Sequence, residues 1–474
     1  MNGHRLAWLF PVVACLTVLA SLAGATGAGA LTFAPPVDYG VGARPADIAS
    51  ADLNGDGRPD LVASAGQGVA VLLATSPGRF APATRIDLGH KTGAVALADV
   101  NGDGGADIVA VCPDDDLVTV LLGDGHGVFV LKGAYPAGDE PMDVVVGDMT
   151  GDGKADVAAA DALGDGLGVL KGDGTGALQA PLDFPVGADC RRLVGADLNG
   201  DGTMDLACSR YSWEEYGGFR VLLADGSGGF TPAGEYEIDS DSGPHGMALA
   251  NLNGDGKADL VVLYGYEGGR TFAYLGDGLG VFIRVSTVEF RGGLDEANGL
   301  AVARMDHDGS DDVVTSGYTP GGSSGTMRVP QSPTRIYILL GSNGGGAFRT
   351  RSFPARRTVG ELVAADLNGD HKTDLAWTDV KSDNVSVRLN GRLPVLTGVS
   401  PAQGRVGAAV ALTGAHFTKR GTTVRFGGVP ATGLVSWSPT RIEVKVPAGT
   451  PKGRVKVTVT TQVGRTAPRS FTRL

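Results

Sequence analysis

The nine residues Asp52-Leu-Asn-Gly-Asp-Gly-Arg-Pro-Asp60 decide the fold of this chain, because the same pattern returns at six further places. The copies start at Asp99, Asp148, Asp197, Asn251, Arg304 and Asp366, and successive starts lie 47, 49, 49, 54, 53 and 62 residues apart. A short apolar segment follows each copy, and a second apolar segment with a Gly-rich hairpin follows that one. This content predicts four short strands in each repeat.

The two ends of the repeat region predict a closed arrangement. A hairpin aromatic residue lies 19 residues before the next loop at both Phe80 and Phe129, and Phe33 lies 19 residues before Asp52. The segment around Phe33 is therefore expected to be the outermost strand of a repeat, and the last repeat, which stops near Asn390, lacks that strand. The sequence predicts an all-β fold, a seven-bladed β-propeller over residues 31–392 closed by the N-terminal strand near Phe33. An open solenoid is the alternative.

The first 30 of the 474 residues have the composition of a signal peptide. Arg5 precedes an apolar segment that extends from Leu6 to Leu22, and Ala28-Gly29-Ala30 offers a small-residue cleavage site. We therefore expect a secreted protein whose mature chain starts near Leu31. A membrane anchor and lipid attachment through Cys15 are the alternatives.

The three remaining cysteines have no spacing typical of a metal site. Cys190 and Cys208 flank one repeat, so an exported protein could join them by a disulfide. Buried free thiols are the alternative interpretation for all three, Cys112 included.

The repeated loops are expected to bind calcium, because oxygen-bearing side chains at alternate positions can surround one ion. In the first loop these are Asp52, Asn54, Asp56 and Asp60, with the carbonyl of Arg58 as a further ligand, and Gly57 permits the sharp turn. The corresponding residues elsewhere are Asp99, Asn101, Asp103, Asp107, Asp148, Thr150, Asp152, Asp156, Asp197, Asn199, Asp201, Asp205, Asn251, Asn253, Asp255, Asp259, Asp366, Asn368, Asp370 and Asp374. A polar turn without an ion is the alternative.

Charge ranks the seven loops. The first four carry three Asp each and are expected to bind most strongly, whereas Asn251 lowers the charge of the fifth. The seventh has His371 where glycine is expected, at a cost in backbone energy. The sixth places Arg304 at the first ligand position, where its guanidinium could pair with Asp306, Asp308 and Asp312, so we expect an empty or weak site.

Residues 393–474 form a second unit of opposite charge. Short alternating strands separated by Gly and Pro predict a small immunoglobulin-like β-sandwich. This segment holds twelve Lys and Arg against one acid, Glu443, whereas residues 31–392 hold 27 basic and 51 acidic residues. The basic unit either binds an anionic polymer, such as acidic polysaccharide, cell-wall phosphate or nucleic acid, or docks on, or is balanced by, the acidic repeats.

The repeats resemble the FG-GAP/VCBS repeats of integrin-like propellers over residues 31–392. The stretch Val399-Ser-Pro-Ala-Gln-Gly404, followed by Gly407, Gly414 and Phe417, resembles an IPT/TIG domain. The first resemblance implies a calcium-dependent extracellular propeller used in adhesion or recognition, and the second implies a fold found in surface receptors, some secreted enzymes and some transcription factors.

Long connections between the second and third strands are the expected location of ligand binding. The candidates are Tyr211, Trp213 and Tyr216 in the fourth repeat, and Tyr318 and Arg328 in the sixth. An extracellular glycan or protein is the expected partner, and simple loop packing is the alternative. The chain has no Gly-x-Ser-x-Gly or His-Glu-x-x-His motif. It is not expected to be an enzyme, and a polysaccharide lyase or hydrolase is the alternative.

Overall fold

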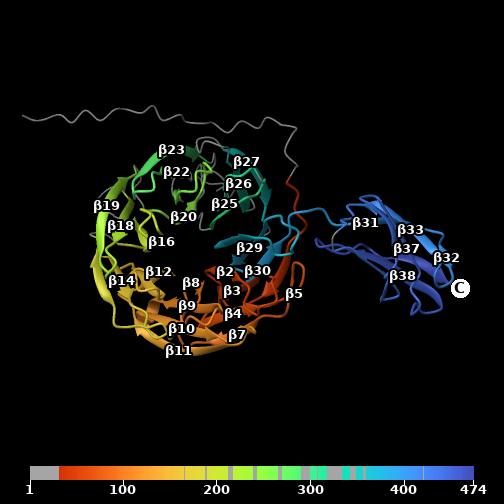
Figure 1. Cartoon of the computed structure of the whole chain (residues 1–474), viewed down its shortest axis with the longest axis horizontal. Coiled ribbons are helices and arrows are strands. Elements are labelled where there is room, and N and C mark those ends of the chain that lie inside the picture. The colour runs from red at the N-terminus through yellow and green to blue at the C-terminus, as the bar shows by residue number, and fades with distance from the viewer. Residues whose placement is uncertain are drawn as a thin grey trace, which may run out of the picture.

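The computed structural model describes residues 31–164, 166–186, 189–211, 217–238, 243–264, 270–289, 299–306, 308–317, 334–341, 348–355, 359–419 and 421–474. Figure 1 shows a ring of small sheets with a separate β-sandwich beside it at the C-terminus. The predicted signal peptide and Cys15 lie outside the described residues. Within those residues, no helix is long and apolar enough to cross a membrane.

The described part of the repeat region forms seven four-stranded antiparallel sheets, which confirms the prediction of four strands per repeat. The first three are β2 (Ile48–Ala51), β3 (Asp60–Ser64), β4 (Gly68–Leu72) and β7 (Thr84–Asp87); β8 (Val95–Ala98), β9 (Asp107–Cys112), β10 (Leu117–Gly123) and β11 (Phe129–Pro136); and β12 (Pro141–Gly147), β13 (Asp156–Asp161), β14 (Gly166–Leu170) and β15 (Leu182–Pro185). A small hairpin, β5 (Ala74–Ser76) and β6 (Arg79–Phe80), and one 3-10 turn, η1 (Pro113–Asp115), interrupt the pattern.

The next three sheets repeat the same order. They are β16 (Leu193–Ala196), β17 (Asp205–Arg210), β18 (Gly218–Ala224) and β19 (Phe230–Glu237); β20 (Gly246–Ala250), β21 (Asp259–Tyr264), β22 (Arg270–Gly276) and β23 (Phe282–Glu289); and β24 (Leu300–Ala303), β25 (Asp312–Gly317), β26 (Arg335–Leu340) and β27 (Arg349–Pro354).

The last sheet joins the two ends of the repeat region. It contains β28 (Leu362–Ala365), β29 (Asp374–Asp379) and β30 (Asn384–Arg388), and its outer strand is β1 (Val37–Gly40). Val37 lies opposite Val387, and an isolated bridge joins Phe33 to Asn390. The N-terminal strand thus covers the edge that β30 would otherwise expose.

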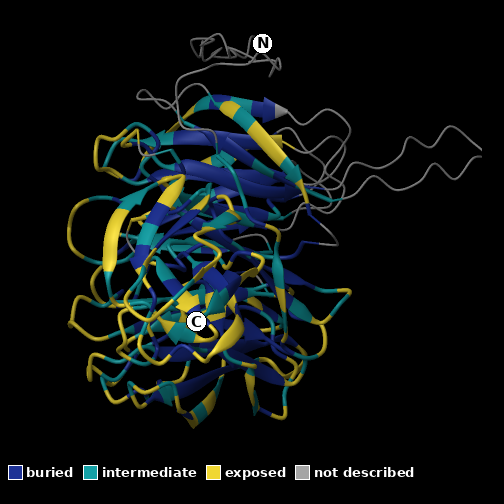
Figure 2. Cartoon of the chain, turned by 90° about the vertical axis from the view of Figure 1, so that its right-hand side faces the viewer, coloured by how far each residue is buried: buried dark blue, intermediate teal, exposed yellow. Residues whose placement is uncertain are grey.

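The core lies between the faces of neighbouring sheets. Second and third strands such as β3 and β4 are buried along their whole length, whereas the outer strand β15 is largely exposed. Alternate residues of one strand pack on opposite sides: Val62 packs with the second sheet, and Leu61 and Ala63 pack with the last. Figure 2 shows buried strands inside and exposed turns outside. Each sheet is therefore held by both of its neighbours.

The C-terminal unit is a sandwich of two sheets. One contains β31 (Val395–Ser400), β33 (Ala409–Ala415), β37 (Arg441–Lys445) and β36 (Leu434–Ser438). The other contains β32 (Gln403–Gly404), β39 (Arg469–Arg473), β38 (Gly453–Thr460), β34 (Thr423–Phe426) and β35 (Val429–Pro430). Its contacts with the ring include a hydrogen bond from Gln462 Nε2 to the Gly369 carbonyl, 2.9 Å, and packing of Val463 against Gly391.

Candidate functional site

The predicted calcium loops all join the first strand of a sheet to its second, so they emerge at the same edge of every sheet. In the five loops that begin with Asp, one carboxylate oxygen of that residue accepts the N–H of the fifth residue, at 3.1–3.2 Å. The other oxygen accepts the N–H of the sixth residue, at 2.7–2.9 Å. The first aspartate therefore wraps the loop around its own carboxylate.

The last aspartate of each loop has a different role, because it is fully buried in all seven. One of its oxygens accepts the N–H of the second loop residue, and the other accepts an N–H at the end of the third strand; we call this pair of bonds the brace. For Asp107 the donors are Val100, at 2.9 Å, and Gly123, at 2.8 Å. The same two bonds occur at Asp60, Asp156, Asp205, Asp259, Asp312 and Asp374. Each brace fixes the loop to the strand ladder.

Burial and the backbone donors act in opposite directions on these carboxyl groups. Burial raises the pKa of Asp312 to about 6 and that of Asp374 to about 8, although the backbone N–H groups of both braces favour the ionised form. Burial also raises the pKa of Asp107. The two backbone donors of each of these braces therefore offset part of the effect of burial on the pKa.

The sharp turn of the loops has the predicted backbone geometry. Gly57 has φ of 78°, and His371, which replaces this glycine in the seventh loop, has φ of 63°. Both lie in the left-handed region that glycine adopts freely and other residues adopt at a cost. The prediction for these two positions is confirmed.

The sixth loop corrects one detail of the sequence interpretation. Arg304 pairs with Asp311, Nε to Oδ1 at 3.3 Å, and among the described residues of this loop it pairs with none of the three carboxylates at ligand positions. Asp311 also accepts the N–H of Asn251 in the fifth loop, at 2.8 Å. The expected pairing with Asp306, Asp308 and Asp312 was therefore wrong. The guanidinium of Arg304 pairs instead with Asp311, whose other oxygen bonds to the fifth loop and so connects the two loops.

The side-chain oxygens of the loops are of the kind that calcium prefers. In this structure they accept hydrogen bonds from N–H groups of the same loop. Within the described ranges, no three acidic, His or Cys side chains are grouped closely enough to hold a metal. Asn101 Nδ2 instead donates to Asp103 Oδ2, at 2.9 Å. Asn251 Oδ1, at the first position of the fifth loop, is buried without a hydrogen-bond partner. Such an orphaned oxygen fits a cation ligand.

Of the predicted ligand-binding residues, only Tyr211 is described. Its backbone N–H donates to the carbonyl of Asp189, and the guanidinium of Arg191 lies 4.4 Å from its ring centre. Trp213, Tyr216, Tyr318 and Arg328 lie outside the described residues.

A group of charged residues at the opposite edge of the sheets was missed from the sequence. Asp47, Asp143, Arg192 and Glu361, which we call the axial cluster, each stand five residues before the first residue of a loop. That fixed offset in four repeats is the signal that could have revealed them. Asp47, Arg192 and Glu361 directly precede the innermost strand of their sheets, and Asp143 is the third residue of β12.

The axial cluster connects neighbouring sheets and also two sheets that are not neighbours. Arg192 Nη2 lies 3.1 Å from Glu361 Oε1, so the pair joins the fourth sheet to the seventh. Asp47 accepts the N–H of Val95 in the second sheet at 2.7 Å, and Asp143 accepts that of Leu193 in the fourth at 3.0 Å. These bonds tie the inner strands together at one edge.

The titration of the axial cluster is set by burial. Burial raises the pKa of Glu361, and the opposing charge of Arg192 lowers it less; the pKa values of Asp47 and Asp143 are raised for the same main reason. The pKa of the adjacent His245 is lowered by burial and then by Arg192. Three buried carboxyl groups thus share one guanidinium, and burial favours their neutral forms.

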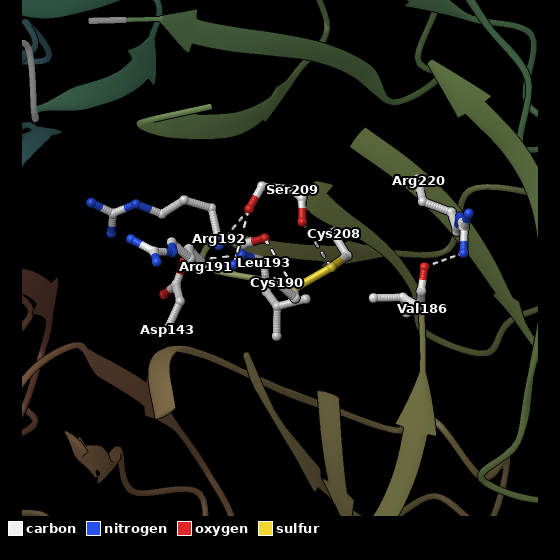
Figure 3. Close-up of a disulfide and its surroundings, with 9 residues drawn as sticks. All are labelled: Asp143, Val186, Cys190, Arg191, Arg192, Leu193, Cys208, Ser209 and Arg220. Atoms are coloured by element: carbon white, nitrogen blue, oxygen red, sulfur yellow. Dashed lines mark hydrogen bonds between the residues drawn. A yellow bond between two sulfur atoms is a disulfide. The ribbon is translucent and has the colours of Figure 1, made fainter. Parts of the chain in front are cut away.

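A disulfide between Cys190 and Cys208 holds the segment that carries Arg192, and Figure 3 shows it beside Arg191 and Arg192. The backbone N–H groups of both arginines also donate to Ser209 Oγ, at 3.0 and 2.9 Å. Of the two alternatives for these cysteines, the structure has the disulfide, whereas Cys112 is a buried free thiol.

Two family models match the sequence of this chain. The model of the FG-GAP-like repeat matches residues 52–110, 99–159, 211–262 and 251–315, and the model of the IPT/TIG domain matches residues 394–472. The chain carries FG-GAP-like repeats followed by a TIG domain. Neither the FG-GAP-like repeat nor the TIG domain is a catalytic family.

Two solved structures are similar at low identity. One, of an Agrocybe aegerita lectin that recognises non-reducing terminal N-acetylglucosamine, is 18% identical with a TM-score of 0.45 and covers 69% of this chain and 91% of its own. The other, of a fungal alcohol oxidase of the AA5 family with copper, is 13% identical with a TM-score of 0.47 and covers 94% of this chain and 100% of its own. No curated protein matches the sequence.

The brace gives a first prediction for the FG-GAP-like repeats. Replacing Asp107 with Ala leaves two buried N–H groups without acceptors, so unfolding in EDTA should become easier by on the order of 3 kcal/mol. Asp103→Ala, which changes an exposed residue of the same loop, serves as the control and should stay within about 0.5 kcal/mol. Urea unfolding followed by fluorescence measures both. Equal stability of the two variants would contradict the brace.

The axial cluster gives a pH prediction. A carboxyl whose folded pKa is raised stabilises the fold below its unfolded pKa, about 4.3 for Glu, and loses that contribution as pH rises through the folded value. The difference in thermal midpoint, wild type minus Glu361→Gln, should therefore decrease as the pH is raised from 5 to 8. Glu235→Gln, at an exposed carboxylate that pairs with Arg210 and Arg220, is the control. A difference that is constant or grows with pH would show that Glu361 is not held this way.

Proposed function

We propose that this chain is a secreted calcium-binding protein, built on a closed seven-bladed propeller, that acts in extracellular recognition or adhesion. The observation that carries the proposal is the repeated first aspartate, which shapes five loops at one edge of the sheets in the same way. Its ligand is proposed to be a glycan or a protein.

Three features support closure into one ring. The outer strand of the last sheet, β1, comes from the N-terminus. The first and last sheets share a buried cluster that includes Leu61 and Val385. The innermost strands β2 and β28 also lie next to each other. A ring of this kind leaves no sheet face uncovered.

The proposed calcium ligands in each loop are the side chains at the first, third and fifth positions and the carbonyl at the seventh. When bound, the ion would neutralise the carboxylates that converge on the turn. The ninth aspartate already gives one lone pair of each oxygen to the brace, so it would reach the ion only with the lone pairs that remain. Its direct coordination stays a proposal.

The bonds within the loops refine the expected order of affinity. Loops one to four and loop seven have a first aspartate that holds the turn, so these five are proposed to bind. The fifth offers Asn251, with one neutral oxygen, and is proposed to bind weakly. The sixth offers Arg304, which repels a cation, and is proposed to stay empty.

Recognition is proposed to lie at the edge opposite the calcium loops or in the TIG domain. In sequence, the longest connections between second and third strands start and end at that opposite edge, and long connections are where binding residues are often found.

Calcium counting tests the proposal directly. The mature chain, dialysed against calcium, should bind five or six ions, as measured by elemental analysis. Arg304→Asp restores a carboxylate at the first position of the sixth loop and should add one ion. Arg351→Asp, at an exposed arginine outside the loops, is the matched control and should add none.

Two outcomes would contradict the proposal. Wild-type protein that binds no calcium would refute calcium binding altogether. Seven ions in the wild type, or no gain with Arg304→Asp, would refute the role assigned to Arg304.

A further inference from the structure

The outer face of one sheet of the TIG domain is strongly basic. The register pairs Arg454 with Thr472, Lys456 with Ser470 and Arg425 with Thr458. Val455, Val457 and Val459 alternate with these residues and are buried in the sandwich core, so Arg454 and Lys456 point outward. Arg465 Nη2 donates to Thr458 Oγ1 at 3.1 Å and adds its charge to this face.

These four cations, Arg425, Arg454, Lys456 and Arg465, form what we call the basic face. All four residues are exposed. The only acid of the domain, Glu443, lies in β37 of the other sheet. Nothing acidic within the TIG domain therefore reduces the potential of the basic face.

The acidic repeats do not neutralise the basic face either. The ion pairs found among the described residues all join residues between Asp56 and His371, and none includes a Lys or Arg of the TIG domain. The contact between the two units instead uses Gln462 and Val463, which are uncharged. Of the two sequence interpretations, this geometry favours a partner outside the chain over internal balance.

The chemistry of the basic face favours a polysaccharide. Side chains two apart on one strand are separated by about 6.6 Å and neighbouring strands by about 4.8 Å, so the cations form a flat array. The hydroxyl groups of Ser470 and Thr472 lie between them. Phe426 and Phe471 point into the core, and among the described residues of this sheet no aromatic side chain is exposed for stacking against bases.

We propose that the basic face binds an acidic polysaccharide, with the cations contacting its carboxylate or sulfate groups and the hydroxyls contacting its sugar oxygens. An acidic polysaccharide would be the ligand in the recognition role proposed above, and the biological meaning of this binding rests on that role. The binding itself needs no calcium, so an assay in EDTA separates its failure from failure of the calcium proposal.

The experiment compares two doubly substituted mature chains with heparin as the probe. Arg454→Glu/Lys456→Glu changes the basic face, and Arg441→Glu/Lys445→Glu makes the same change of net charge at exposed positions of the other sheet. Kd is measured in EDTA at several NaCl concentrations by surface plasmon resonance. The first variant should weaken binding at least tenfold and reduce the slope of log K against log salt by about two, as expected for two lost ion contacts. The second should stay within about threefold of the wild type.

Other outcomes would overturn the proposal. Equal weakening by both variants would mean that only net charge matters. Single-stranded DNA of matched charge binding more tightly than heparin would assign the basic face to nucleic acid. If the wild type did not bind heparin at 50 mM NaCl, the basic face would not be a polysaccharide-binding site. Circular dichroism and thermal unfolding of both variants establish that the TIG domain stays folded.

Discussion

A buried carboxylate that accepts two backbone N–H groups is the interaction on which the rest of the repeat region depends. Each brace connects a loop to the end of the third strand and so fixes where the first and second strands of a sheet can lie. Asp205, for example, holds Leu198 of its loop and Ala224 of β18 at 2.9 and 2.8 Å. Because the carboxylate is buried, its two N–H donors have no water to bond to instead, and losing the carboxylate would leave them unsatisfied at a cost in stability.

The brace also dictates sequence beyond the loop. At Gly172, which donates to Asp156, an added Cβ would lie 2.0 Å from the Ala155 carbonyl oxygen, so no larger residue fits. Leu198 and the other second loop residues are buried in the clusters between sheets. Loop, strand end and core are thus one unit, and its repetition produces sheets that can pack around a common axis.

The two edges of the ring use charge in opposite ways. At the loop edge, carboxylates are separated from one another by backbone donors, and the exposed ones are available to a cation. At the other edge, Arg192 holds Glu361 across the axis, and the disulfide fixes the segment from which Arg192 extends. The TIG domain adds a third pattern, a flat array of cations with no acid near it.

Much of this arrangement follows from local sequence. The repeat spacing predicts the sheets, and the position of Phe33 indicates the strand that pairs with the last repeat, because both depend on short, regular patterns. The brace could not be predicted from local sequence, because an aspartate at the ninth loop position suits a calcium ligand and a buried hydrogen-bond acceptor equally well. Arg304 shows the same limit: pairing with Asp311 rather than Asp308 depends on side-chain direction. The axial cluster depends on residues from separate repeats meeting at one axis, which only the assembled ring brings together.

The brace holds each repeat whether or not an ion is bound. Amide hydrogen exchange of the mature chain, with EDTA and with calcium, tests it most directly. The N–H groups of Val100 and Gly123 should exchange slowly in both conditions, whereas those of Asp103 and Gly104, which donate to the exposed Asp99, should exchange faster in EDTA and slow down when calcium is added. If the Val100 and Gly123 amides exchanged in EDTA as fast as those of Asp103 and Gly104, the ninth aspartate would not be an independent brace.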